Sequence, residues 1–189
     1  MNGYQIVSEA LLISSDNHSF NVEDWDNGKS KVLLITGFAG SGKSTLGRYL
    51  AKKNNAKYIE FDGDIFDNDE FMNKKSELGS NKPPQETIDQ IRKYALNRLK
   101  NIKEKTVLEG AWMISWLTPQ DIGQYPVIMI GSSILKSAIQ SFTRRIKSNK
   151  KYPDYKRSPF KSAYLDAMFN INILMKKYNE LLRYLRNKS

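Results

Sequence analysis

A continuous apolar run that leads into a glycine-rich turn constrains the fold of this chain more than any other feature. The run covers residues 32–36 and has the composition of a strand buried on both faces. The turn at 37–44, GFAGSGKS, fits the pattern G-x-x-x-x-G-K-[ST] at every fixed position. Residues 43–54 then have the apolar spacing of a helix. A strand, a turn of this pattern and a helix, in this order, indicate a phosphate-binding loop.

The residues of the loop have the chemistry that binding a nucleotide phosphate requires. Glycines let the backbone turn tightly and point successive N–H groups at a phosphate, and the following helix adds the positive end of its dipole. Lys43 supplies a cation for the β and γ oxygens, and the Ser44 hydroxyl supplies a hard oxygen ligand for Mg²⁺. We therefore predict that ATP, with Mg²⁺ as cofactor, is bound by Gly37, Ala39, Gly40, Ser41, Gly42, Lys43, Ser44 and Thr45.

Carboxylates follow two further apolar segments. Asp62 and Asp64 come directly after 57–61, and Glu109 comes directly after 106–108. In a doubly wound sheet, the carboxyl ends of the strands face the binding crevice. One carboxylate there can accept the proton of an acceptor hydroxyl, and another can hold a Mg²⁺-bound water. We predict a metal site of Ser44, Asp62 and Glu109; the alternatives are an Asp-Gly surface turn and an exposed carboxylate at a strand end.

Strands and helices alternate along the chain. Besides the segments above, we expect strands at 57–61, 106–108 and 127–130, and helices from Pro84 to Ile102, at 134–146 and at 161–186. This alternation predicts an α/β protein with a parallel sheet and helices on both faces. We expect one domain over 31–189. A preface over 1–30 precedes it, with possible hairpin strands at 4–7 and 10–13 and a turn at Asn27-Gly28.

The phosphate loop, followed some twenty residues later by Phe61-Asp62-Gly63-Asp64, resembles the small P-loop kinases of the shikimate, gluconate and adenylylsulfate kinase group. It is also similar to the kinase domains of polynucleotide 5′-kinases and of bacteriophage kinases that act on modified DNA bases. The resemblance covers about residues 31–157. It implies a P-loop NTPase three-layer sandwich of nucleoside-monophosphate-kinase-like architecture. By position it makes Asp64 the catalytic base and Asp62 its magnesium-side companion.

The resemblance also implies a lid, and it leaves two features open. Small kinases of this kind close an arginine-bearing lid over the phosphates. We expect the lid near 144–159, with Arg144 and Arg145 as catalytic contacts and Arg157 as a substrate contact; the alternative is a solvated basic connection. The preface fits none of these family patterns, and no fifth core strand follows the lid. We therefore expect either a four-stranded parallel core or a sheet that the preface completes.

The charge distribution and two tryptophans bear on the acceptor. Residues 1–110 are neutral overall, with 16 basic and 16 acidic side chains, so the net charge of +10 lies in the last 79 residues. This asymmetry indicates a polyanionic partner or, alternatively, a solvated lysine-rich surface. Trp112 and Trp116 lie on the same face of a helix if their segment is helical. Two interpretations are open: the rings stack on a planar acceptor, or they form part of the core. We predict a kinase for a hydroxyl of a nucleic acid or nucleotide. A small-metabolite kinase and a nucleic-acid-binding NTPase stay open as alternatives.

Several classes are excluded or disfavoured by composition. The chain has no cysteine, which excludes disulfides, thiolate metal sites and cysteine nucleophiles. No apolar run approaches the roughly 18 residues of a membrane span, and the N-terminus lacks the features of a secretory signal. We therefore expect a cytoplasmic protein with no membrane partner. The sequence does not indicate its oligomeric state.

Overall fold

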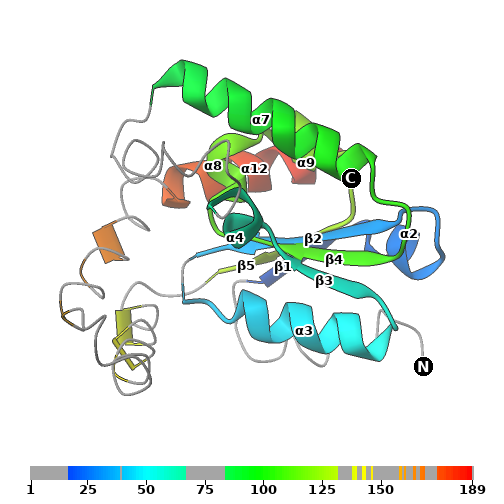
Figure 1. Cartoon of the computed structure of the whole chain (residues 1–189), viewed down its shortest axis with the longest axis horizontal. Helices are drawn as coiled ribbons and strands as arrows, with labels where there is room; N and C mark the ends of the chain where they lie inside the picture. Colours follow the sequence, from blue (N-terminus) through cyan, green and yellow to red (C-terminus); the bar gives the residue numbers. More distant parts are fainter. Residues whose placement is uncertain are drawn as a thin grey trace.

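The computed structural model describes residues 17–38, 40–66, 84–131 and 174–188, together with single positions between 138 and 168. The strands predicted at 4–7 and 10–13 and most of the helix predicted at 134–146 lie outside these residues. Figure 1 shows the described strands as a central sheet with the described helices around it. Within the described residues, no helix has both the length and the apolar character needed to cross a membrane.

The sheet has five strands in the order β1-β5-β2-β4-β3. They are β1 (Asn17–Phe20), β2 (Val32–Gly37), β3 (Lys57–Glu60), β4 (Thr106–Glu109) and β5 (Val127–Ile130). The four strands predicted from apolar runs pair in parallel, with β2 between β4 and β5. The fifth strand, β1, pairs antiparallel with β5. Of the two expected arrangements, the structure therefore has the sheet that the preface completes.

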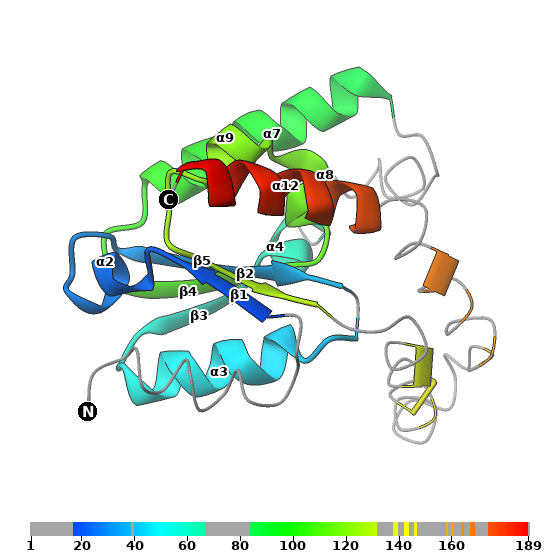
Figure 2. The same cartoon turned by 180° about the vertical axis from the view of Figure 1, so that it is seen from behind.

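Both faces of the sheet are covered, because alternate residues of the strands pack into two separate cores. Val32 and Leu34 of β2 pack toward one face, and Leu33 and Ile35 toward the other. Helices on the first face are α4 (Phe61–Phe66), α7 (Gln85–Lys100), α8 (Met113–Trp116), α9 (Pro119–Ile122) and α12 (Met175–Lys188); those on the second are α2 (Val22–Asp26) and α3 (Lys43–Lys53). Figure 2 shows the two helical layers from behind. The predicted α/β three-layer fold is confirmed.

The part of the preface that the structure describes contributes to the second core. Trp25 of α2 is 1% exposed and packs with the β2 residues of that face, and the Lys105 ammonium lies 4.2 Å from the centre of its ring. The chain then turns at Asn27-Gly28, where Gly28 has a positive φ of 75°, as the sequence predicted. The domain boundary at residue 30 stays a prediction.

An ion pair between the partly exposed Arg92 and the buried Asp121 joins α7 to α9. Arg92 contacts Asp121 with two hydrogen bonds, Nε to Oδ2 at 2.7 Å and Nη2 to Oδ1 at 3.1 Å. Asp121 also forms a capping box with Thr118 at the start of α9, because its carboxylate accepts from the Thr118 N–H and hydroxyl. Burial alone would raise the pKa of Asp121, but the hydrogen bonds from Arg92 and Thr118 outweigh it and lower the pKa.

We expect Asp121→Asn to lower the free energy of unfolding by about 1 kcal/mol at pH 7, because it weakens the charge-assisted hydrogen bonds to the partly exposed Arg92 and the helix cap formed with Thr118. A lowered folded-state pKa means that the ionised carboxylate stabilises the fold above the unfolded pKa of about 4. That contribution disappears as pH falls through the folded-state pKa, so the difference between variant and wild type should shrink toward pH 3. Urea unfolding at pH 7 and pH 3 measures this. Asp89→Asn, on the exposed side of α7, is the matched control and should cost less than about 0.5 kcal/mol.

Candidate active site

The glycine-rich loop starts where β2 ends, between the carboxyl ends of β4 and β5. Gly37 has a φ of 136°, and a Cβ at this position would collide with the carbonyl oxygen of Ile130 in β5. The close approach of β5 therefore requires glycine here. Within the loop, Gly42 has a φ of 95° and is the N-cap of α3. Of the predicted loop residues, Ala39 lies outside the described residues.

Lys43, the first residue of α3, lies inside the loop and is only 6% exposed. Its Nζ donates a hydrogen bond to the backbone carbonyl of Phe38 at 2.8 Å. The hydroxyl of Ser41, in the same loop, is buried and has no hydrogen-bond partner among the described residues. Thr45 lies in the first turn of α3 and is exposed. The loop thus places an ammonium group and a buried hydroxyl together at the N-terminus of a helix, where an anion is favoured.

Two of the three predicted metal-side residues, Ser44 and Glu109, contact each other in the structure. The Ser44 hydroxyl of α3 donates to Oε1 of Glu109, at the end of β4, at 2.9 Å. The Tyr58 hydroxyl of β3 donates to the same Oε1 at 3.0 Å. Burial raises the pKa of Tyr58, and the nearby Glu109 carboxylate raises it further, so the phenol keeps the proton that it donates. Glu109 itself is 3% exposed.

Asp62 lies in the first turn of α4, where it contacts the backbone that follows β4. Its carboxylate accepts hydrogen bonds from the N–H groups of Ala111, at 2.8 Å, and Trp112, at 3.2 Å. Gly110 permits this approach, since a Cβ there would lie 2.5 Å from Oδ1 of Asp62. Burial raises the pKa of Asp62 to about 7, although the charge of Lys43 and the two N–H groups act in the opposite direction. Asp62 is therefore a carboxylate that changes protonation near neutral pH.

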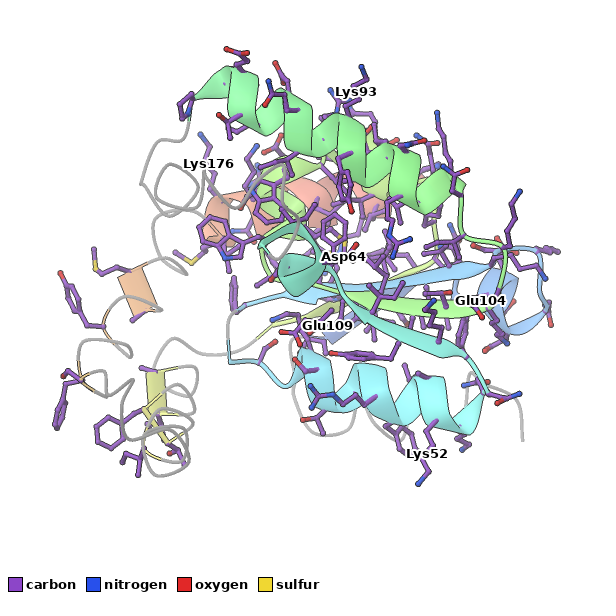
Figure 3. All side chains as sticks on the ribbon, viewed as in Figure 1. Lys52, Asp64, Lys93, Glu104, Glu109 and Lys176 are labelled. Atoms are coloured by element: carbon purple, nitrogen blue, oxygen red, sulfur yellow. The ribbon has the colours of Figure 1, made fainter. Side chains whose placement is uncertain are left out.

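Asp64 has different surroundings from Asp62. Its Oδ2 accepts a hydrogen bond from Nε of Arg98 in α7 at 3.2 Å, and both side chains are partly exposed. Figure 3 shows Asp64 on the side of the sheet that α7 covers, whereas Glu109 lies toward α3. The structure thus gathers Lys43, Ser44 and Glu109 around the loop, with Asp62 within electrostatic reach of Lys43 and Glu109, and it pairs Asp64 with Arg98.

The two tryptophans form a stacked pair across α8, with Trp112 at its N-cap and Trp116 as its last residue. Their ring centres are 5.9 Å apart with an angle of 18° between the planes. Trp116 is 2% exposed and also packs against Phe61, so it belongs to the core. Trp112 is only partly buried, and its backbone N–H is one of the two that donate to Asp62. The pairing predicted from the helical spacing is therefore present, with Trp112 as the accessible member.

Tyr58 was not predicted as a residue of the site. The feature of the sequence that could have indicated it is its place in a strand that ends beside the acidic residues, two positions before Glu60 on the same face.

The predicted lid cannot be compared with the structure, since Arg144, Arg145 and Arg157 lie outside the described residues. Their roles stay predictions.

The fold and the loop define a P-loop nucleotide-binding protein, a class whose domains bind nucleotide, typically with Mg²⁺. A family model described as an AAA domain matches residues 33–128, just over half of the chain. The chain therefore belongs to this family of P-loop NTPase domains, which includes kinase-like members. A search of curated proteins finds no match to the chain.

Proposed function

We propose that this protein is an ATP- and Mg²⁺-dependent kinase that transfers the γ-phosphate to a hydroxyl of a nucleic-acid or nucleotide-like acceptor. The observation that carries the proposal is the position of Asp62. Its carboxylate lies within electrostatic reach of Lys43 and Glu109 and changes protonation near pH 7. A base with such a pKa suits the removal of a proton from an alcohol at neutral pH.

The loop and its surroundings supply the nucleotide site. Backbone N–H groups of the loop and the Lys43 ammonium would bind the phosphates of ATP. The hydroxyl of Ser44 and the carboxylate of Glu109 are hard oxygen donors of the kind that Mg²⁺ prefers. No group of three acidic or histidine side chains in the described part of the chain forms a metal cage, which suits an ion that keeps several waters and phosphate oxygens. When bound, Mg²⁺ neutralises charge on the β and γ oxygens.

The contacts favour Asp62, rather than Asp64, as the group that handles the acceptor. The sequence-based prediction gave Asp64 this role and placed Asp62 on the magnesium side. Asp64 is instead occupied by the Arg98 guanidinium. In the proposed step, the acceptor oxygen forms a bond to the γ-phosphorus, the bond to the β–γ bridging oxygen breaks, and ADP leaves. The hydroxyl proton passes to the ionised carboxylate of Asp62.

Trp112 supports a planar acceptor. Trp112 is partly exposed, and its own backbone N–H donates to Asp62. A base stacked on the Trp112 ring would therefore bring its sugar hydroxyl near the Asp62 carboxylate. The basic excess of the last 79 residues favours an acceptor that carries phosphates. A small-metabolite kinase would need neither feature.

Incubation with γ-³²P-ATP and a panel of oligonucleotides, nucleosides and sugar acids tests the proposal. We expect label to appear on the oligonucleotide or nucleoside, and oligonucleotide binding to weaken steeply with salt because neutralised phosphates release counterions. Label on a sugar acid alone would place the acceptor among small metabolites. Release of inorganic phosphate without any labelled acceptor would overturn the kinase assignment and leave the NTPase alternative.

A further inference from the structure

The Tyr58 side chain packs between β3 and α3, where a glycine of α3 leaves room for its ring. Its ring lies against Gly47, where a Cβ would come within 2.9 Å of the ring carbon Cε2. Gly47 is buried in the middle of α3, a position at which glycine costs about 0.5–1 kcal/mol relative to alanine. The guanidinium of Arg48 lies 5.3 Å from the centre of the same ring. The helix thus carries an unfavourable residue where the ring of Tyr58 needs the space.

The place of the ring determines where its hydroxyl lies. The hydroxyl donates to Oε1 of Glu109, the oxygen that also accepts from Ser44. Two hydroxyl donors from different elements therefore fix one oxygen of this buried carboxylate. The other oxygen, Oε2, has no hydrogen bond to any described residue. A carboxylate fixed at one oxygen and available at the other is arranged to receive an ion or its water in a defined direction.

We propose that Tyr58 is a positioning residue that orients Glu109 toward the Mg²⁺ of the bound nucleotide, and that Gly47 is glycine because the Tyr58 ring must reach Glu109. This inference rests on the proposed use of Ser44 and Glu109 on the magnesium side. Tyr58 does not touch ATP or the acceptor in this proposal. It acts through the orientation of the carboxylate.

Tyr58→Phe removes the hydroxyl and keeps the ring against Gly47. We expect the concentration of Mg²⁺ needed for half-maximal binding of a fluorescent ATP analogue to rise about tenfold, as the loss of an outer-shell partner of a metal ligand typically does. Binding of the analogue in EDTA should not change. In transfer assays, saturating Mg²⁺ should restore most of the rate. Tyr125→Phe is the matched control, because Tyr125 is also partly buried but follows α9 near the amino end of β5.

Gly47→Ala provides an independent variant that keeps the hydroxyl. The new methyl group would displace the ring, so we expect the Mg²⁺ requirement to rise as in Tyr58→Phe. Thermal unfolding identifies any variant that fails to fold. If wild-type binding depends on Mg²⁺ and both variants keep the wild-type requirement, the role of Tyr58 is wrong. If wild-type binding does not depend on Mg²⁺, the failure lies with the proposed magnesium site instead.

Discussion

Replacing Lys43 with alanine is expected to lower the rate of phosphoryl transfer at least about a hundredfold, because the variant loses the central cation facing the transferred phosphate. The protein should stay folded, since the Lys43 side chain donates a hydrogen bond to a backbone carbonyl of the loop and belongs to neither hydrophobic core. Single-turnover transfer from labelled ATP measures the effect, and circular dichroism monitors the fold. Near-normal turnover in this variant would contradict the P-loop kinase assignment.

The same helix offers a control for this experiment. Lys52 lies at the far end of α3, is exposed, and points away from the sheet in Figure 3. Lys52→Ala removes the same charge from the same helix without touching the loop. We expect its transfer rate to stay within a factor of two or so of wild type, which separates the position of Lys43 from the loss of one positive charge.

The second large effect is expected at Asp62. If its carboxylate receives the acceptor proton, Asp62→Asn should lower transfer by about 10²- to 10⁴-fold, the usual contribution of a general base, with little change in ATP binding. Asp64→Asn is the matched control, because it removes a carboxylate two residues away whose partly exposed ion pair with Arg98 contributes little. The reverse result, with transfer lost only in the Asp64 variant, would restore the assignment made from the sequence.

Asp62 also makes a prediction about pH. Its folded-state pKa of about 7 lies above the ordinary value of 3.8, so the folded protein holds this proton more tightly than the unfolded chain does. The stability that this provides is present at low pH and is lost as pH rises through 7. We expect the unfolding free energy of Asp62→Asn, relative to wild type, to increase by roughly 2 kcal/mol between pH 5 and pH 8. Urea unfolding without nucleotide or Mg²⁺ measures it; an unchanged difference would mean that the pKa is not raised.

β2, β4 and β5 were predictable because each is a buried apolar run, and such runs can be recognised without knowledge of their neighbours; β3, with Lys-Tyr-Ile-Glu, is only partly buried. β1 is different. Its sequence, Asn-His-Ser-Phe, has neither an apolar run nor a clear alternation, and it becomes a strand because the edge of β5 is available for pairing.

Tertiary contact also determines the secondary structure around Phe61 and Ile65, which are both fully buried and lie four residues apart. That spacing makes 61–66 a helix, where the sequence suggested the end of a strand and a turn.

The helix at 61–66 explains why the roles of the two aspartates could not be assigned from their spacing. Residues two apart lie on one side of an extended chain, but on nearly opposite sides of a helix. Asp62 therefore points toward residues 110–112, and Asp64 toward α7. The sequence placed Ser44 and Glu109 in one site because the carboxyl ends of parallel strands face the same crevice, and the two residues are in contact. The contribution of Tyr58 was not predictable, since it depends on the space that Gly47 leaves.

The strand order has a consequence for how the protein is made. β1 leaves the ribosome before any other described strand, yet its partner, β5, ends at residue 130. β2, which carries the phosphate loop at its end, likewise waits for both of its neighbours, since they lie at 106–109 and 127–130. Pairings this distant in sequence close slowly, because the entropy of a long loop must be lost first. Residues well beyond the phosphate loop must therefore be synthesised before β2 can pair with its neighbouring strands. We expect the nascent chain to bind nucleotide only after that later part of the chain has been made.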